Sequence, residues 1–275
     1  MRSAALAGLP AASAERPEPP ALWRTFPSRT ATFCLVELQK LSHDRTELFT
    51  RAVQPVLWLV IFGQTFSRIH AIPTGSTSYL DFLAPGIIAQ SGLFVAIFYG
   101  IQIIWERDAG VLSKLLVTPT PRAALILGKG FSAGIRALAQ VVVVLVVSAI
   151  LGVALTVNPL KIVATFVVVM LGSAFFACLS MSIAGIVLKR DRLMGIGQMI
   201  TMPLFFASNA LYPLAVMPPW LRALSRVNPL TYEVNALRGL LIGTPANYPV
   251  DFAVLIAFVI AGVTTASLLI GRLAR

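Results

Sequence analysis

Few side chains in this sequence could carry acid–base or metal chemistry, and those present are scattered along the chain. It holds 11 acidic residues and two histidines. No HExxH or GxSxG motif occurs, and Gly128-Lys129 lacks the preceding glycine of a phosphate-binding loop. The two cysteines, Cys34 and Cys178, have no disulfide or metal-ligand spacing. The sequence therefore predicts a protein that is not an enzyme, with no metal site and no cofactor of its own.

One compact polar segment, residues 105–122, stands out as a candidate contact surface. Acids near its start suit a helix N-terminus, a glycine loosens the chain, leucines follow at helical spacing, and two prolines then stop the helix. We expect a short amphipathic helix along the membrane surface that a soluble partner could push. An ordinary loop with good helix caps is the alternative. The residues behind this pattern are Glu106, Asp108, Gly110, Leu112, Leu115, Leu116, Pro119 and Pro121.

The elements that position this segment are predicted to be membrane-spanning helices, in an all-α integral membrane fold. The chain is 57% hydrophobic and only 12% charged, whereas a soluble domain is about 25% charged. A bilayer core of about 30 Å needs roughly 20 apolar residues per helix. Uncharged stretches of suitable length predict six spans, at about 52–67, 82–105, 131–156, 162–188, 193–214 and 252–271.

The positive charge is distributed as expected for a membrane protein. Most of the 22 Lys and Arg residues fall in alternate connections, on the side that holds both termini. The positive-inside rule therefore predicts cytoplasmic termini in the cell membrane, and the net charge of +11 is not a sign of nucleic-acid binding. Arg136 lies within the third predicted span, and we expect it and Lys129 to extend toward the lipid headgroups.

Two regions outside the spans have their own character. Residues 1–28 predict a disordered cytoplasmic tail without the apolar core of a signal peptide, and 29–275 one transmembrane domain. Residues 31–50 predict a helix with one charged face, lying in the membrane interface or packed on the protein itself. Prolines 213, 218 and 219 preclude one straight helix in an apolar stretch, which favours short re-entrant helices on the outer side over an ordinary outer loop.

Three stretches in order resemble the membrane subunit of ABC-2 type exporters, particularly the daunorubicin-resistance permease group. They are 44–63, which includes Gln54-Pro55, 79–129, which includes Ala84-Pro85-Gly86 and Thr118-Pro119, and 228–238, which begins Asn-Pro-Leu-Thr-Tyr. Together they cover residues from about 30 to 240. Many members carry Thr directly after the glycine and then an acid, where this chain has Val111 and Ser113.

The resemblance implies six transmembrane helices, an N-terminal interfacial helix, a coupling helix between the second and third spans, and outer re-entrant helices before the sixth. It also implies two permease copies, identical or related, working with two separate ATPase subunits that bind ATP and Mg²⁺. The family pattern places the ATPase contact on Glu106, Arg107, Asp108, Gly110, Leu115 and Pro119, with Asp44 and Arg45 as a second contact.

The same resemblance places the second and fifth spans on a two-fold axis, where substrate passes. Aromatic and amide side chains on these spans suit an amphipathic or lipid-like substrate, such as a drug, polyketide or glycolipid. Ordinary helix packing, with the amides bonded to their neighbours, is the alternative. The residues concerned are Gln90, Phe94, Phe98, Gln198, Phe205, Phe206 and Asn209.

The function that these patterns predict is the permease subunit of an ATP-driven exporter. Two other interpretations stay open from the sequence: a carrier or channel that works without ATP, and a membrane scaffold that transports nothing. The sequence does not choose the substrate, nor between a homodimer and a heterodimer.

Overall fold

The computed structural model describes residues 35, 45–69, 72–74, 77–112, 114 and 121–273, and no strand occurs among them. The expected tail, 1–28, and most of the expected interfacial helix, 31–50, lie outside this part. The elements in chain order are α2 (Arg45–Leu57), the π-helical segment η1 (Trp58–Gly63), α3 (Gln64–Ile69), α4 (Tyr79–Asp108), α6 (Arg122–Ile150), α7 (Pro159–Val187), α8 (Arg190–Phe206), the 3₁₀ turn η2 (Leu214–Val216), α9 (Pro219–Val227), α10 (Pro229–Ile242) and α11 (Tyr248–Leu273).

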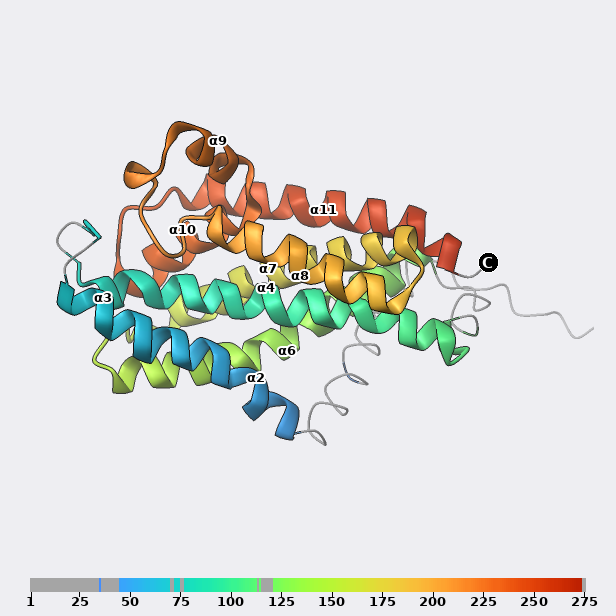
Figure 1. Ribbon diagram of the computed structural model, residues 1–275, viewed down its shortest axis with the longest axis horizontal. Helices are drawn as coiled ribbons and strands as arrows, with labels where there is room; N and C mark the ends of the chain where they lie inside the picture. Colours follow the sequence, from blue (N-terminus) through green and yellow to red (C-terminus); the bar gives the residue numbers. More distant parts are fainter. Residues whose placement is uncertain are drawn as a thin grey trace, which may run out of the picture.

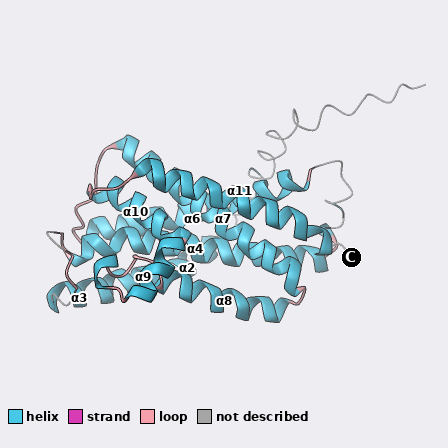
Figure 2. Ribbon diagram, turned by 90° about the horizontal axis from the view of Figure 1, so that it is seen from above, coloured by secondary structure: helices cyan, strands magenta, loops and turns pink. Residues whose placement is uncertain are grey.

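The long helices lie side by side along the long axis of the molecule (Figure 1). Helix α7 is central and packs against α4, α6 and α11. The short helices α9 and α10 gather at one end, which we call the α9–α10 end. The end of α4, the start of α6, the α7–α8 turn and the end of α11 lie at the opposite end, which we call the α4–α6 end (Figures 1 and 2).

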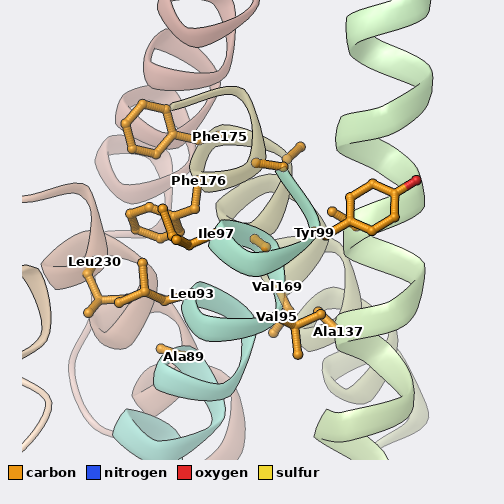
Figure 3. Close-up of a cluster of buried hydrophobic side chains, with 14 of the residues drawn as sticks. Ala89, Leu93, Val95, Ile97, Tyr99, Ala137, Val169, Phe175, Phe176 and Leu230 are labelled. Atoms are coloured by element: carbon orange, nitrogen blue, oxygen red, sulfur yellow. The ribbon is translucent and has the colours of Figure 1, made fainter. Parts of the chain in front are cut away.

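The core forms where apolar side chains of α4 and α7 meet. Leu93 and Ile97 of α4 lie beside Phe176 of α7, and all three are almost completely buried (Figure 3). Phe175 stacks edge-on against Phe258 of α11, with ring centroids 5.1 Å apart. Burial of such side chains is worth about 1.5–3 kcal/mol each in water, and in lipid the same close packing contributes through dispersion contacts.

Small residues allow α4 and α7 to approach closely. A Cβ added to Gly100 would lie 2.8 Å from the Ala177 carbonyl oxygen, so only glycine fits there. The Ser180 hydroxyl uses this proximity to donate a 2.7 Å hydrogen bond to the Ile97 carbonyl. Contacts of this kind hold membrane helices together where lipid provides no hydrophobic drive.

Helices α4, α6, α7 and α11 are each long and apolar enough to cross a membrane. They correspond to the spans expected at 82–105, 131–156, 162–188 and 252–271. Helix α6 begins at Arg122, well before 131. The spans expected at 52–67 and 193–214 fall on α2–η1–α3 and on α8, and α8 ends at Phe206 rather than near 214.

The region expected to form short re-entrant helices contains α9 and α10. Helix α10 is mostly buried against α4, α7 and α11. Helix α9 instead exposes Trp220, Leu224 and Val227 on one face. The chain therefore folds back at the α9–α10 end, as the prolines predict.

Candidate functional site

The candidate contact segment begins where α4 ends. The N-cap Ser78 fixes the start of this helix, because its hydroxyl oxygen accepts a 3.1 Å hydrogen bond from the Asp81 amide. Its last turn contains Glu106, Arg107 and Asp108, and Gly110 follows with a φ of 70°. A left-handed glycine just beyond a helix is a common stop signal, so the chain turns sharply out of α4 at this point.

Glu106 joins α4 to α6. The Lys129 ammonium nitrogen lies 2.6 Å from the Glu106 carboxylate, and the lysine side chain is only 9% exposed while the glutamate is 21% exposed. A partly buried ion pair is screened less by water and salt than a surface pair. The two helices are therefore linked at the α4–α6 end by a charged contact.

Arg107 joins α4 to the turn between α7 and α8. Its Nη1 donates a 2.9 Å hydrogen bond to the Leu188 carbonyl oxygen, and its Nη2 lies 2.7 Å from the Asp108 carboxylate. Leu188 closes α7 in a left-handed conformation, with φ 56°, which turns its backbone toward this arginine. The last turn of α4 thus contacts both α6 and the α7–α8 turn at this end of the bundle.

Two basic residues of α6 contact one aromatic ring of α4. The Arg136 guanidinium lies 5.0 Å from the centroid of the Tyr99 ring, and the Lys129 ammonium lies 5.9 Å from it. Figure 3 shows Tyr99 reaching from α4 across to α6. Both cations are within about 6 Å, the range of a cation–π contact. The two side chains are buried against α4, whereas we expected them to extend toward headgroups.

The rest of the expected ATPase contact is only partly described. Val111, Leu112 and Lys114 are helical, and Leu112 is completely buried. Arg45 begins α2. Leu115, Pro119 and Asp44 lie outside the described residues.

Three of the seven expected substrate-path residues line one cavity. Gln90, Phe94 and Phe98 face a space of about 260 Å³ between α2, α4 and α6. Gln90 is 3% exposed, and Gln140 of α6, which the sequence analysis did not single out, is 2% exposed. The remaining lining residues are Thr50, Gln54, Pro55, Ser91 and Val95.

The other four residues lie on or near α8, apart from this cavity. Gln198 and Phe206 are exposed. Phe205 is completely buried, with its ring 5.9 Å from that of Trp58. The Asn209 amide donates a 2.6 Å hydrogen bond to Asn235. The structure therefore does not gather the seven residues around one space within this chain.

Two buried charged residues of α10 were not recognised from the sequence. Arg238 is 6% exposed, and its guanidinium donates to the Phe82 carbonyl at 3.2 Å and the Asn209 carbonyl at 2.7 Å. Glu233 is completely buried against Gly172, and neither carboxylate oxygen has a hydrogen-bond partner among the described residues. Their spacing of five places them on different sides of α10. The signal available was that Glu233 and Arg238 are the two charged residues of a largely apolar 14-residue helix.

Long apolar helices around a buried core define a multi-pass membrane protein. No cluster of three potential metal ligands occurs within the described ranges. The profile of the ABC-2 type transporter family matches residues 31–242. The chain therefore belongs to the ABC-2 type transporter family.

Several relatives are transport proteins by name. The chain is 30% identical to the ycf38 transport permease of Porphyra purpurea over 73% of this chain and 69% of that protein. It is 21% identical to the daunorubicin resistance ABC transporter permease protein DrrB1 of Streptomyces coeruleorubidus, over 85% of this chain and 82% of that one. It is 26% identical to the doxorubicin resistance ABC transporter permease protein DrrC of Mycobacterium tuberculosis, over 77% and 76%. Across the ycf38 relatives, the chain spans 66% to 69% of their length.

Proposed function

We propose that this chain is the membrane-spanning permease subunit of an ATP-driven ABC exporter. ATP and Mg²⁺ bind in a separate ATPase subunit, present in two copies. Relatives named as ABC transporter permeases support this assignment. The exported molecule is amphipathic or lipid-like, such as a drug, a polyketide or a glycolipid.

The observation that carries the proposal is the pair of contacts at the end of α4. Glu106 bonds to Lys129 on α6, and Arg107 bonds to the Leu188 carbonyl at the α7–α8 turn. A push on the segment after Asp108 therefore reaches three neighbouring helices at once. The proposed ATPase contact comprises Glu106, Arg107, Asp108, Gly110, Leu115 and Pro119, with Asp44 and Arg45.

The α4–α6 end faces the cytoplasm in this proposal, and both termini lie on that side of the cell membrane. Basic residues cluster at this end, as the positive-inside rule requires. They include Arg107 in the last turn of α4, Arg122 at the start of α6, Lys189 and Arg192 around the α7–α8 turn, and Arg272 in the last turn of α11.

Two further segments complete six membrane spans. One is the continuous helical run of α2 to α3, from Arg45 to Ile69, and the other is α8, from Arg190 to Phe206. At the outer side, α9 and α10 enter the membrane as re-entrant helices. The exposed Trp220, Leu224 and Val227 suit contact with the outer leaflet. A second permease copy, identical or related, pairs with this chain.

The proposal is tested by isolating the tagged full-length chain from its native membrane. An ATPase subunit should co-purify in about equal amounts, as mass spectrometry can determine. The reconstituted complex should hydrolyse ATP and carry a fluorescent probe, such as daunorubicin, into inside-out vesicles. Glu106→Lys should reduce ATP-driven uptake at least tenfold, because two like charges would then meet at the α4–α6 contact and the charge offered to the ATPase would be reversed.

Lys161→Glu provides the matched control, since it also reverses a charge but lies at the α9–α10 end of the bundle. This variant should retain uptake. The proposal fails if no ATPase co-purifies and the chain alone moves the probe down its gradient. It also fails if the two charge reversals affect uptake equally.

A further inference from the structure

The cavity between α2, α4 and α6 contains polar groups that nothing in the described part of the chain satisfies. The amide nitrogen and oxygen atoms of Gln90 and of Gln140 are all buried without a hydrogen-bond partner. Both side chains line the cavity, one from α4 and one from α6. The packing interpretation requires buried amides to bond to neighbouring helices. These two amides do not.

Buried amides without partners destabilise a fold, because they lose their hydrogen bonds to water and gain none in return. Leucine has a similar size and would avoid this penalty at both positions. The amide atoms have almost no accessible surface, so a ligand in this space would bond to them once the Gln90 and Gln140 side chains turn toward it. Each glutamine offers two donor hydrogens and one acceptor oxygen, so a hydroxyl or amide group can bond to both.

The other lining residues determine which ligands fit. Pro55, Phe94, Val95 and Phe98 provide apolar walls, and none of the lining side chains is ionisable. A charged group entering the cavity would lose its hydration without meeting a counter-charge. The cavity therefore favours a neutral polar group attached to an apolar body.

The size of the cavity also restricts the ligand. Its volume of about 260 Å³ lies just below the roughly 300–1,000 Å³ of sites that enclose drug-sized molecules. The cavity therefore holds one end of a larger amphiphile while the rest remains among the helices or in lipid. Gln54 lies at its edge on α2 and is exposed, which marks an open side.

A second cavity lies along the same α4–α6 interface, nearer the α4–α6 end. It measures about 270 Å³ and is lined by Gln102, Glu106 and Arg136, among others. Arg136 precedes Gln140 by four residues, so the two share one face of α6. Polar side chains thus follow the interface between α4 and α6 from Glu106 and Lys129 inward to Gln90 and Gln140.

We propose that the cavity formed by Gln90, Gln140 and Phe98 binds the neutral, hydrogen-bonding head of an amphiphile, such as a long-chain molecule with a hydroxyl group. The two glutamine amides bind the head, and the phenylalanine rings contact the start of the apolar chain. As a substrate site, it rests on the export function proposed above. As a binding site, it does not require an ATPase.

Photolabelling of the full-length chain in lipid nanodiscs tests this site. Three probes share one diazirine-bearing alkyl chain and end in a hydroxyl, an amine or a carboxylate. The alcohol should label peptides from α2, α4 and α6, and the two charged probes should label them several-fold less. Gln90→Leu and Gln140→Leu should each weaken apparent affinity for the alcohol about fivefold, as expected for loss of one hydrogen bond.

Gln198→Leu is the matched control, because it removes an exposed glutamine of α8 outside the cavity. Its labelling should equal that of the parent chain. The thermal unfolding midpoints of Gln90→Leu and Gln140→Leu should be equal to or higher than that of the parent chain. Variants that fail to fold would show that the amides have structural partners, and that result would overturn the proposal.

Equal labelling by all three probes would also overturn it, as would labelling that neither cavity variant changes. The experiment uses no ATPase and no nucleotide. Specific labelling without a co-purifying ATPase would therefore reject the export function and retain the binding site. ATP-driven uptake without specific labelling would reject the binding site and retain the export function.

Discussion

The two ends of the helix bundle hold their charged side chains in different ways. At the α4–α6 end, charges pair with other side chains that water can reach: Glu106 is 21% exposed and Arg107 is 27% exposed. At the α9–α10 end, Arg238 and Glu233 are buried and neither forms an ion pair among the described residues. Arg238 bonds instead to backbone carbonyls of the α4 start and of the turn after α8.

This difference indicates which end of the helix bundle can move. Water can replace a partner of an exposed ion pair such as Arg107–Asp108 at little free-energy change, so this contact can break and form again during a cycle, whereas the partly buried Glu106–Lys129 pair costs more to open. A buried guanidinium bonded to carbonyls has no such substitute. We therefore interpret the α9–α10 end as the fixed end of the bundle and the α4–α6 end as the one able to rearrange.

The largest effect is expected from Arg238→Leu. Loss of the guanidinium removes its bonds to the buried Phe82 and Asn209 carbonyls and its contact with the Phe82 ring, which should destabilise the fold by about 3 kcal/mol. Thermal unfolding in detergent should show a large drop in midpoint. Arg226→Leu, at an exposed position of α9, should change it little. Similar midpoints for the two variants would contradict the fixed-end interpretation.

Gly172→Ala tests the packing around Glu233 and should have the next largest effect. An added methyl group would overlap the Glu233 carboxylate, and overpacking of this kind typically costs about 1–3 kcal/mol. The double variant Gly172→Ala, Glu233→Ala should recover most of the lost stability, because the second change vacates the space. Additive losses in this double-mutant cycle would show that the two residues do not meet.

Glu106→Gln should produce a smaller loss of stability, of about 1–2 kcal/mol, because its partner Lys129 is mostly buried and would lose its counter-charge. Adding Lys129→Gln should restore part of the loss. Unfolding in increasing salt provides a second measurement, since the parent chain should lose more stability than the double variant. If salt lowered the stability of the parent chain and of the double variant equally, the Glu106–Lys129 ion pair would not contribute to stability.

Arg107→Gln should have the smallest effect on stability, about 0.5–1 kcal/mol, because the side chain is partly exposed. We expect transport to fall further than stability, since the bond to the Leu188 carbonyl links α4 to the α7–α8 turn. The ratio of probe transported to ATP hydrolysed measures this. If the ratio of probe transported to ATP hydrolysed did not change, Arg107 would stabilise the α4–α6 end without taking part in coupling.

The sequence was sufficient for the long helices and insufficient for their contacts. Helices α4, α6, α7 and α11 were predictable because each contains a long apolar window. The early start of α6 was missed because Lys129 appears too polar for a span, and only the folded chain shows Glu106 beside it. Helix α8 ends early where the following carbonyls bond to Arg238, a partner 29 residues from Asn209.

The candidate cavity shows the same limit. Gln90, Phe94 and Phe98 recur every fourth residue, so their common face is visible in the sequence. Gln140 belongs to another helix, and its position opposite Gln90 depends on how α4 and α6 pack. No pattern within one segment of the sequence predicts how α4 and α6 are aligned along each other.

The bond from Arg107 to Leu188 has an evolutionary consequence. Its acceptor is a main-chain carbonyl, which every amino acid supplies. Positions 107 and 188 should therefore show no correlated substitutions across relatives, although they touch. The same holds for Arg238 and the carbonyls that it contacts. Methods that infer contacts from paired sequence changes should be blind to both.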